Sequence, residues 1–317
     1  MALVSAWELE DHRRMSQPLI SVCIAAFNAD KYIETTLRSL GAQTHGGWEV
    51  IVTEDGSSDR TQSFVQEFAA NVPQRVIYNR NKKNQGVPAT RNTGIAAASG
   101  EWVALLDADD LWKPDHLESL LSTCQIEEPD LVFAGSVLYD NATWTRLGLQ
   151  APSEADLADL PLALFTGRLS IPSSAVMIRR ESLKKFGPFY KEYPNCSSNE
   201  YWLRILSMGG RLSYSGTNTC IYRQNLAPQP RKVTTVLSES ARICERYAGW
   251  NAIPRSLARE RPADLYRQAG RSLLDENPSA ALDALFQALR LQPLSPKTLG
   301  LCAKVYLQKS TRRRRAA

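Results

Sequence analysis

Short apolar runs alternate with longer amphipathic stretches through residues 18–139, and this alternation limits the possible folds more than any other feature. The apolar runs have the length of strands, and the stretches between them repeat apolar residues at helical spacing. This order is typical of a mostly parallel sheet covered by helices. The predicted strands are 20–26, 48–53, 75–78, 102–106 and 131–138; the predicted helices are 31–42, 59–70, 89–98 and one that begins at Pro114. We expect Ser57 or Ser58 to cap the second helix.

Acidic residues follow two of the predicted strands. Glu54-Asp55-Gly56-Ser57-Ser58-Asp59 comes after the second, and Asp107-Ala108-Asp109-Asp110 after the fourth. Ligands of open α/β sheets bind beyond the carboxyl ends of the strands. Carboxylates this close together need a counter-charge when buried, and a divalent cation carrying a diphosphate would provide one. The alternative is an Asp-rich turn that caps the next helix.

A basic residue lies between these acidic segments. Arg91 follows a turn at residues 84–88, near the expected start of a helix. Its rigid fork of donors could hold a base carbonyl or a phosphate, and helix amides favour anions. Pairing of Arg91 with a carboxylate is the alternative interpretation.

Composition excludes several classes of protein. Apolar residues make up 43% of the 317 and charged residues 22%, so the chain can bury a core and is not disordered. The longest apolar run, 19–27, is far shorter than the roughly 20 residues of a membrane span. That run lies between acidic and polar residues, unlike a secretory signal, which favours a cytoplasmic protein. The six cysteines are scattered without a C-x-x-C pair, so neither a zinc site nor a disulfide framework is expected.

Charge is distributed unevenly along the chain. Residues 1–229 carry 21 Lys and Arg against 26 Asp and Glu, whereas residues 230–317 carry 17 against 7. The basic part ends in Arg312-Arg313-Arg314-Arg315. Such a segment could be drawn to anionic headgroups at the inner face of a membrane. A solvated basic tail is the alternative, and nucleic acid is not the expected partner.

Two long segments carry a resemblance to a known family. PLISVCIAAFNADKYIETTLRSLGAQTHGGWEVIVTEDGSSDRT and NQGVPATRNTGIAAASGEWVALLDADDLWKPDHL resemble the nucleotide-binding half of the family 2 inverting glycosyltransferases, and the likeness resumes more weakly over 171–204. The resemblance implies an α/β fold with a GT-A-type nucleotide-binding sheet and flanking helices. It also implies a UDP- or dTDP-linked sugar donor, a saccharide or lipid-linked acceptor, and Mn²⁺ or Mg²⁺.

The resemblance also assigns roles by position in the motifs. The residues expected to contact the donor nucleoside are Ala26, Phe27, Asp55 and Arg91. Asp107 and Asp109 match the family's D-x-D element: the first is expected near the ribose or a metal-bound water, and the second on the metal ion. The chain departs from the usual family residues in having Ala25-Ala26-Phe27-Asn28 for Pro-x-Tyr-Asn, and Glu54-Asp55 for Asp-Asp.

The general base is harder to assign. In the family it is the aspartate of a Glu-Asp pair that precedes a Trp-Leu-Arg helix, and aligning Trp202-Leu203-Arg204 places Ser197 and Ser198 on that pair. A serine is not a base unaided at neutral pH. Glu200 is the nearest carboxylate and is the predicted catalytic residue, with Glu192 as the reserve.

The predicted division of the chain is an N-terminal extension at 1–17, a GT-A glycosyltransferase domain at 18–230 and a C-terminal all-α region with a basic tail at 231–317. Helical spacing marks 233–247, 263–274, 280–291 and 297–307, and residues 277–307 are similar to part of a tetratricopeptide-type hairpin. We expect these helices to pack on the catalytic domain or on a partner.

Two functions remain open at this stage. The first is a metal-dependent inverting glycosyltransferase of bacterial polysaccharide biosynthesis. The second is a nucleotide-sugar-binding module of weak or no activity, suggested by Ser197 and Ser198. Dinucleotide-dependent oxidoreduction would need G-x-G-x-x-G where the chain has Ala25-Ala26-Phe27-Asn28, so it is not expected.

Overall fold

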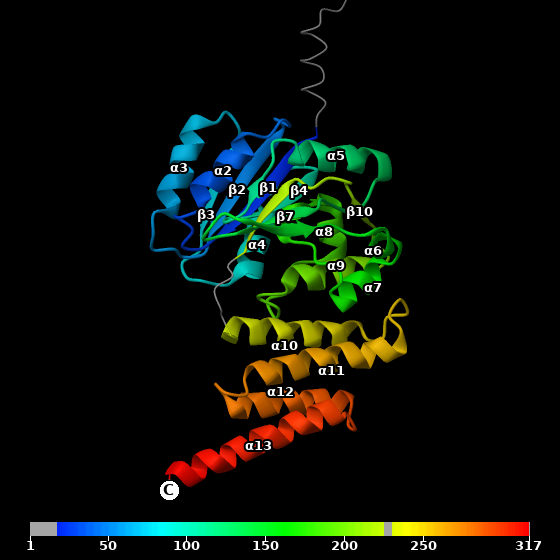
Figure 1. The fold of residues 1–317 in the computed structure, drawn as a ribbon. Helices are drawn as coiled ribbons and strands as arrows, with labels where there is room; N and C mark the ends of the chain where they lie inside the picture. Colours follow the sequence, from blue (N-terminus) through cyan, green and yellow to red (C-terminus); the bar gives the residue numbers. More distant parts are fainter. Residues whose placement is uncertain (1–17, 225–229, 317) are drawn as a thin grey trace, which may run out of the picture.

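A computed structural model describes residues 18–224 and 230–316 (Figure 1). The extension predicted at 1–17 lies outside the described residues. An α/β domain with two sheets comes first, and a stack of helices follows it, so the predicted fold class is confirmed. The division at residue 230 stays a prediction.

The larger sheet is mixed and has the strand order β10-β6-β9-β4-β1-β2-β3. Its strands are β1 (Ile20–Ala26), β2 (Trp48–Glu54), β3 (Val76–Arg80), β4 (Trp102–Asp107), β6 (Leu131–Phe133), β9 (Val176–Arg179) and β10 (Leu212–Tyr214). β1 to β4 are parallel, as the alternating sequence pattern predicts. β1 lies between β2 and β4, so the two acidic segments follow strands that are not direct neighbours.

Successive side chains of a strand point to opposite faces of the sheet, and a buried core covers each face. Val22 and Ile24 of β1 pack in one core with Leu37 and Leu40 of α2. Cys23 faces a second core on the other side of the sheet. The helices of the α/β domain are α2 (Ile33–Gly41), α3 (Thr61–Asn71), α4 (Val87–Ala96), α5 (His116–Glu127), α6 (Glu154–Ala158), α7 (Leu160–Thr166), α8 (Arg180–Phe186) and α9 (Ser197–Ser207).

The strand predicted at 131–138 is wrong in one respect, because the chain changes sheets inside it. β6 ends at Phe133, and β7 (Ser136–Asp140) belongs to a four-stranded sheet of order β5-β11-β7-β8. The other strands of this small sheet are β5 (Leu111–Trp112), β8 (Arg146–Gln150) and β11 (Cys220–Gln224). At the crossing, a Cβ on Gly135 would lie 2.0 Å from Asn218 Oδ1, so any other residue there would require the Asn218 side chain to move.

The expected cap of α3 is also wrong. Ser57 Oγ accepts a hydrogen bond from Asn28 N instead of from the helix. Asp59 takes the capping role, because its Oδ1 accepts from both the N and the Oγ1 of Thr61 at the start of α3. Ser57 thus connects this loop to the loop after β1, and Asp59 binds the start of α3.

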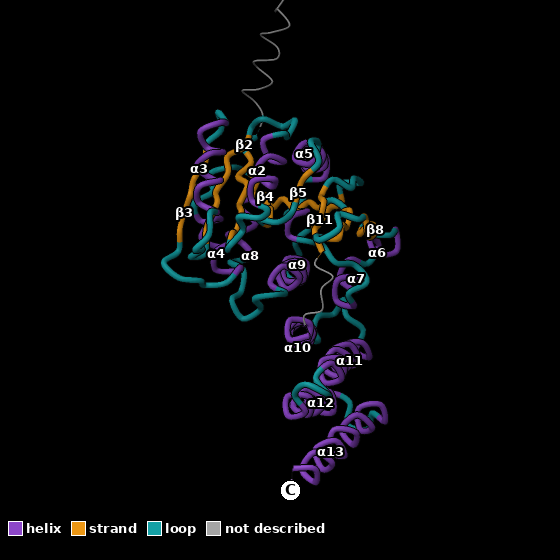
Figure 2. Tube along the Cα trace, turned by 60° about the vertical axis from the view of Figure 1, so that its left-hand side comes forward, coloured by secondary structure: helices purple, strands orange, loops and turns teal. Residues whose placement is uncertain are grey.

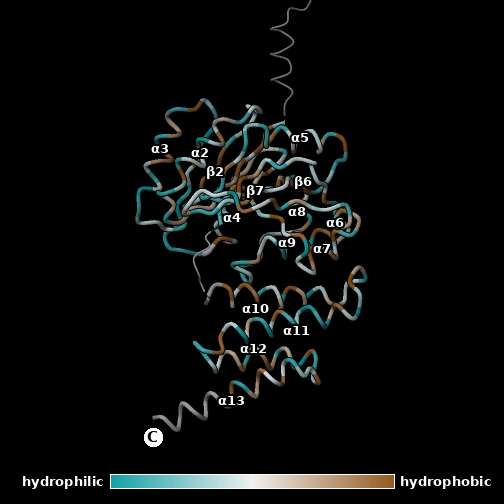
Figure 3. The backbone as a smooth tube through the Cα atoms, viewed as in Figure 1, coloured by the Kyte–Doolittle hydropathy of each residue, from teal (hydrophilic) through white to brown (hydrophobic). Residues whose placement is uncertain are grey.

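Four C-terminal helices stack on one another and on α9 (Figure 2). They are α10 (Pro230–Tyr247), α11 (Arg255–Ser272), α12 (Pro278–Leu291) and α13 (Pro296–Ala316). Ala241, Cys244 and Tyr247 of α10 share the second core with Tyr201 of α9. The expected packing of the C-terminal helices on the domain before them is therefore confirmed. The alternating hydropathy along these helices is visible in Figure 3. The likeness of 277–307 to a tetratricopeptide-type hairpin stays a prediction.

Among the described residues, none of the helices combines the length and the apolar character that a membrane span requires.

Candidate functional site

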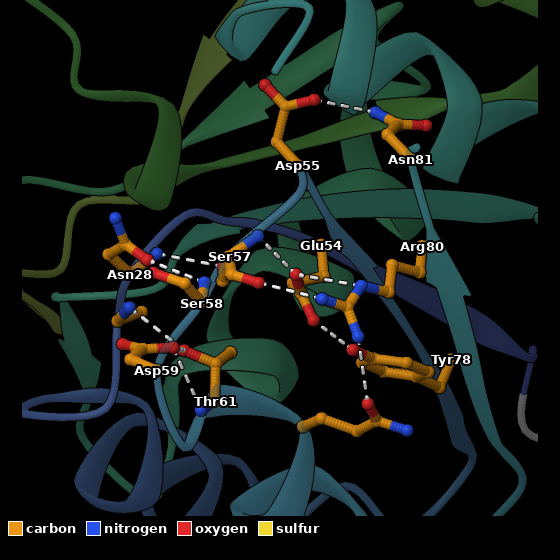
Figure 4. A network of polar contacts seen from close by, with 12 residues as sticks. Asn28, Glu54, Asp55, Ser57, Ser58, Asp59, Thr61, Tyr78, Arg80 and Asn81 are labelled. Carbon is orange, nitrogen blue, oxygen red and sulfur yellow. Dashed lines mark hydrogen bonds and ion pairs between the residues drawn. The ribbon is translucent and has the colours of Figure 1, made fainter. Parts of the chain in front are cut away.

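Four parallel strands bring their following loops to one edge of the large sheet. The loops after β1 and β2 interlock there (Figure 4). Asn28 N donates to Ser57 Oγ at 2.9 Å, and Ser58 N donates to Asn28 Oδ1 at 3.1 Å. Asn28 has a φ of 46°, a left-handed conformation that asparagine tolerates better than most residues. The edge is therefore held in place before any ligand arrives.

Glu54 belongs to this scaffold and does not face a ligand. Its side chain is 1% exposed and accepts hydrogen bonds from Ser57 N and the Tyr78 hydroxyl (Figure 4). Arg80 Nε lies 3.6 Å from Glu54 Oε1 and supplies the counter-charge. The carboxylate predicted to help hold a cation is thus neutralised inside the loop, which corrects that part of the prediction.

The residues expected beside the nucleoside surround the interlocked loops. Ala26 is buried at the end of β1, whereas Phe27 is 50% exposed. The Asp55 carboxylate accepts from Asn81 Nδ2 at 2.7 Å, Gln85 N at 2.9 Å and Gly86 N at 2.8 Å. It therefore shapes the loop between β3 and α4. Contact of Ala26, Phe27 and Asp55 with a donor base stays a prediction.

Three aspartates, one at the end of β4 and two just after it, lie in three different environments. Asp107 is partly exposed and accepts from Ser173 Oγ at 2.7 Å. Asp109 is exposed. Asp110 is buried and accepts from Ser174 Oγ at 2.5 Å. Ser173 and Ser174 thus each bind one of these carboxylates.

Electrostatics separate Asp110 from the other two. Burial raises the pKa of Asp110 well above its usual range, and the neighbouring charges of Asp109 and Asp107 add to this. The Arg223 backbone N donates to Asp110 Oδ1 at 2.9 Å and favours its charged form. Asp110 is therefore an anchor between β4 and β11, and Asp107 and Asp109 are the carboxylates that a ligand could reach.

Arg91 bridges two sides of the site. It is 4% exposed; its Nη2 lies 3.0 Å from Asp107 Oδ1, and its Nη1 donates to Ser198 Oγ at 3.1 Å. Its guanidinium also covers the Phe189 ring at 5.0 Å. Of the two interpretations of Arg91, pairing with a carboxylate is the one seen here. Contact with a donor base stays a prediction.

The burial of Glu200 contradicts its prediction as the general base. Its side chain is 0% exposed. Oε2 accepts from Arg204 Nη2 at 2.7 Å, and Oε1 accepts from the Tyr247 hydroxyl at 2.8 Å. Because both oxygens are occupied inside the core, no acceptor hydroxyl can reach them. The reserve candidate, Glu192, is exposed in the loop before α9.

The helical region holds the start of α9 through a second buried carboxylate. Glu239 of α10 is 1% exposed and accepts from Asn195 N, Asn195 Nδ2 and Cys196 N at 2.9, 2.7 and 3.0 Å. Ser198, which contacts Arg91, lies two residues further on. The position of the site's α9 wall therefore depends on α10.

Sequence reasoning missed Arg223. Its guanidinium lies over the rings of Tyr32 and Trp144, at 5.2 and 4.8 Å. Burial lowers its pKa, and the charges of Asp109 and Asp110 oppose this. Arg223 and Asp110 are 113 residues apart in sequence, so no local spacing could have indicated the pairing.

The oxygen ligands of the site suit a hard divalent cation. No three or more His, Cys, Asp or Glu side chains converge on a common point in the described part of the chain. Magnesium is usually held by one or two carboxylates together with phosphate oxygens and water. Asp109, with Asp107 two residues before it, fits this kind of site, in which the nucleotide would complete the coordination.

These features define an open α/β fold with reachable carboxylates at one edge of its large sheet, and comparison identifies its family. The Glycosyl transferase family 2 model matches residues 21–187, so the chain belongs to that family.

Similar proteins include a putative teichuronic acid biosynthesis glycosyltransferase, TuaG, of Bacillus subtilis. It is 30% identical over 66% of this chain and 80% of its own length. The uncharacterized glycosyltransferase alr2836 of Nostoc is 33% identical, and the match spans 53% of each protein. The chain thus covers only about half of that relative.

The fold resembles that of Staphylococcus aureus TarS 1–349, solved in complex with UDP. The TM-score is 0.62 at 18% identity, and the match covers 93% of this chain and 91% of TarS 1–349. It includes the C-terminal part of the chain, beyond residue 187. At this identity, the likeness shows the fold alone.

Proposed function

We propose that this chain transfers a sugar, with inversion, from a nucleotide donor to a hydroxyl of a saccharide or lipid-linked acceptor. The observation that carries the proposal is the edge beyond β1, β2 and β4, where Asp107 and Asp109 are the reachable carboxylates. A UDP- or dTDP-linked sugar is the proposed donor. The UDP bound in TarS, a protein of the same fold, supports this choice.

Each residue of the edge has a defined part in the proposed binding. Phe27 is exposed where it can pack on a base, and Asp55 orders the loop that closes that side. Asp107 is held by Arg91 and Ser173 and would lie near the ribose of the donor. Asp109 would hold Mn²⁺ or Mg²⁺. When bound, the cation neutralises the charge of the departing nucleoside diphosphate.

Inversion is a direct displacement at the anomeric carbon. The acceptor oxygen attacks opposite the diphosphate, its bond to carbon forms as the glycosidic bond to phosphate breaks, and a carboxylate removes its proton. With Glu200 buried, we assign that last step to Glu192, the exposed carboxylate of the loop before α9.

A nucleotide-sugar-binding module without turnover is the second candidate. Two observations favour it: Ser198 stands at the family's base position and is held by Arg91, and Glu200 is locked in the core. The helical region that packs on α9 would then serve assembly. Its basic end could also contact an anionic membrane surface, although the side chains of the terminal arginines lie outside the described residues.

One experiment separates these functions. The purified chain is titrated with UDP- and dTDP-sugars in the presence of Mn²⁺, and release of the nucleoside diphosphate is followed with saccharide acceptors. We expect Asp109→Asn to abolish metal-dependent binding. The control Asp115→Asn changes an exposed residue eight positions after the end of β4 and should retain binding.

Its outcomes are distinct. Binding with release supports the enzyme, and binding without release for any pair supports the module. No heat with any donor in Mn²⁺ or Mg²⁺ overturns both.

A further inference from the structure

A groove between α4 and α8 lies next to the candidate site but takes no part in the proposed transfer. Its volume is about 440 Å³, which is within the range of small-molecule sites. Most of its lining is apolar, from Ile95, Ala96, Ala98, Leu183, Pro188 and Phe189. The helices that form it are close neighbours in Figure 2.

Two cations stand at the rim of this groove. Arg180 and Lys184 line it, and both are exposed. They are four residues apart on α8 and therefore share one face, where like charges repel. Neither side chain forms an ion pair with any described residue. An anion placed between them would relieve that repulsion.

The floor of the groove is fixed by hydrogen bonds and ring packing. Asn92 Nδ2 donates to Phe189 O at 2.8 Å, and Phe189 N donates back to Asn92 Oδ1 at 2.9 Å. The Phe189 ring stacks on that of Tyr201, with centroids 4.3 Å apart. A site built on such a floor needs little reorganisation to accept a ligand.

We propose that this groove binds an amphiphile with one hydrocarbon chain and a phosphate head. The chain would cover the apolar lining and the phosphate would lie between Arg180 and Lys184. Inorganic phosphate would leave the lining in water, and a neutral or cationic amphiphile would leave the two cations without a partner. Arg91 covers the Phe189 ring, so the groove shares a wall with the candidate site. Binding here does not require glycosyl transfer to occur.

The test uses octyl phosphate below its micelle concentration, titrated into the full chain by calorimetry. We expect saturable one-to-one binding. Inorganic phosphate, which has the head alone, and octyltrimethylammonium, which has the same chain with the opposite charge, should bind at least about tenfold more weakly. No saturable binding of octyl phosphate, or equal binding of either comparison compound, overturns the proposal.

Variants place the site in the groove. Lys184→Glu should weaken octyl phosphate at least about tenfold, because it replaces an attractive charge with a repulsive one. Lys185→Glu is the matched control, because Lys185 is on the same helix but does not line the groove. The affinity of this variant for octyl phosphate should change less than twofold. Ala96→Trp, which fills the groove from an exposed position, should abolish binding. Equal effects of the two lysine variants, or unchanged binding in Ala96→Trp, would place the ligand elsewhere.

Discussion

Arg91 and Asp107 form an ion pair of 3.0 Å at the edge of the large sheet, with the arginine 4% exposed and the carboxylate partly open to solvent. The pair connects α4 to the end of β4. Because the other terminal nitrogen of Arg91 reaches Ser198 on α9, one guanidinium fixes three elements of the site. This makes Arg91 a positioning residue for Asp107.

Arg91→Lys should weaken donor binding. A lysine has no planar fork, so it cannot contact Asp107 and Ser198 together, and Asp107 loses its orientation. We expect about a tenfold loss of affinity for UDP with Mn²⁺ by calorimetry. Ser198→Ala keeps the ion pair and is the control, with a loss of less than about threefold. Equal losses in the two variants would show that the pair with Asp107 is not what matters.

Glu200→Gln should reduce stability. The change leaves the Arg204 charge buried without its partner, and breaking such a pair costs about 3 kcal/mol of unfolding free energy. Glu192→Gln, at an exposed site, should change the unfolding free energy by less than about 0.5 kcal/mol. Denaturant unfolding measures both. A Glu200→Gln protein of unchanged stability but without turnover would restore Glu200 as the base.

Glu239→Gln should loosen the start of α9. A neutral amide cannot accept from Asn195 N, Asn195 Nδ2 and Cys196 N as strongly as a carboxylate does. We expect faster amide hydrogen exchange at residues 195 and 196 and a loss of about 1–3 kcal/mol of stability. Glu260→Gln, an exposed carboxylate on α11, is the matched control. Unchanged exchange in Glu239→Gln would contradict a role of α10 in holding this wall.

His116 should make the protein sensitive to acid. Burial lowers the pKa of His116 to about 3, whereas in the unfolded chain it is about 6.5. Below pH 6.5 the unfolded chain takes up a proton that the folded chain does not bind until about pH 3. Stability is therefore lost as the pH falls through this window, by up to about 1.4 kcal/mol per pH unit.

The variant His116→Gln removes this titration. It should be less stable than the unchanged protein at pH 7.5, because the contact with Thr219 and the packing on Trp112 are altered. The difference in unfolding free energy between the two proteins should narrow as the pH falls from 6.5 to 5. A constant difference from pH 7.5 to 5 would mean that His116 does not remain neutral in the folded protein.

The order of the elements could be predicted because each depends on a local pattern. β1 has the predicted bounds, and β2 and β4 differ from them by one residue. The break at Gly135 was missed because nothing in the apolar run of residues 131–138 shows that Asn218 lies against it. A change of sheet is decided by a contact between distant segments, not by periodicity.

The sequence by itself determined that a parallel α/β sheet forms and that acidic residues follow β2 and β4, since side-chain period and strand direction are properties of the chain. Only the tertiary structure decided which carboxylates remain reachable. Glu54 and Glu200 look as available in the sequence as Asp109. The fold buries both and places partners beside them: Arg80 beside Glu54, and Arg204 and Tyr247 beside Glu200. The groups that compensate a buried charge come from distant parts of the chain, so only the tertiary structure shows them.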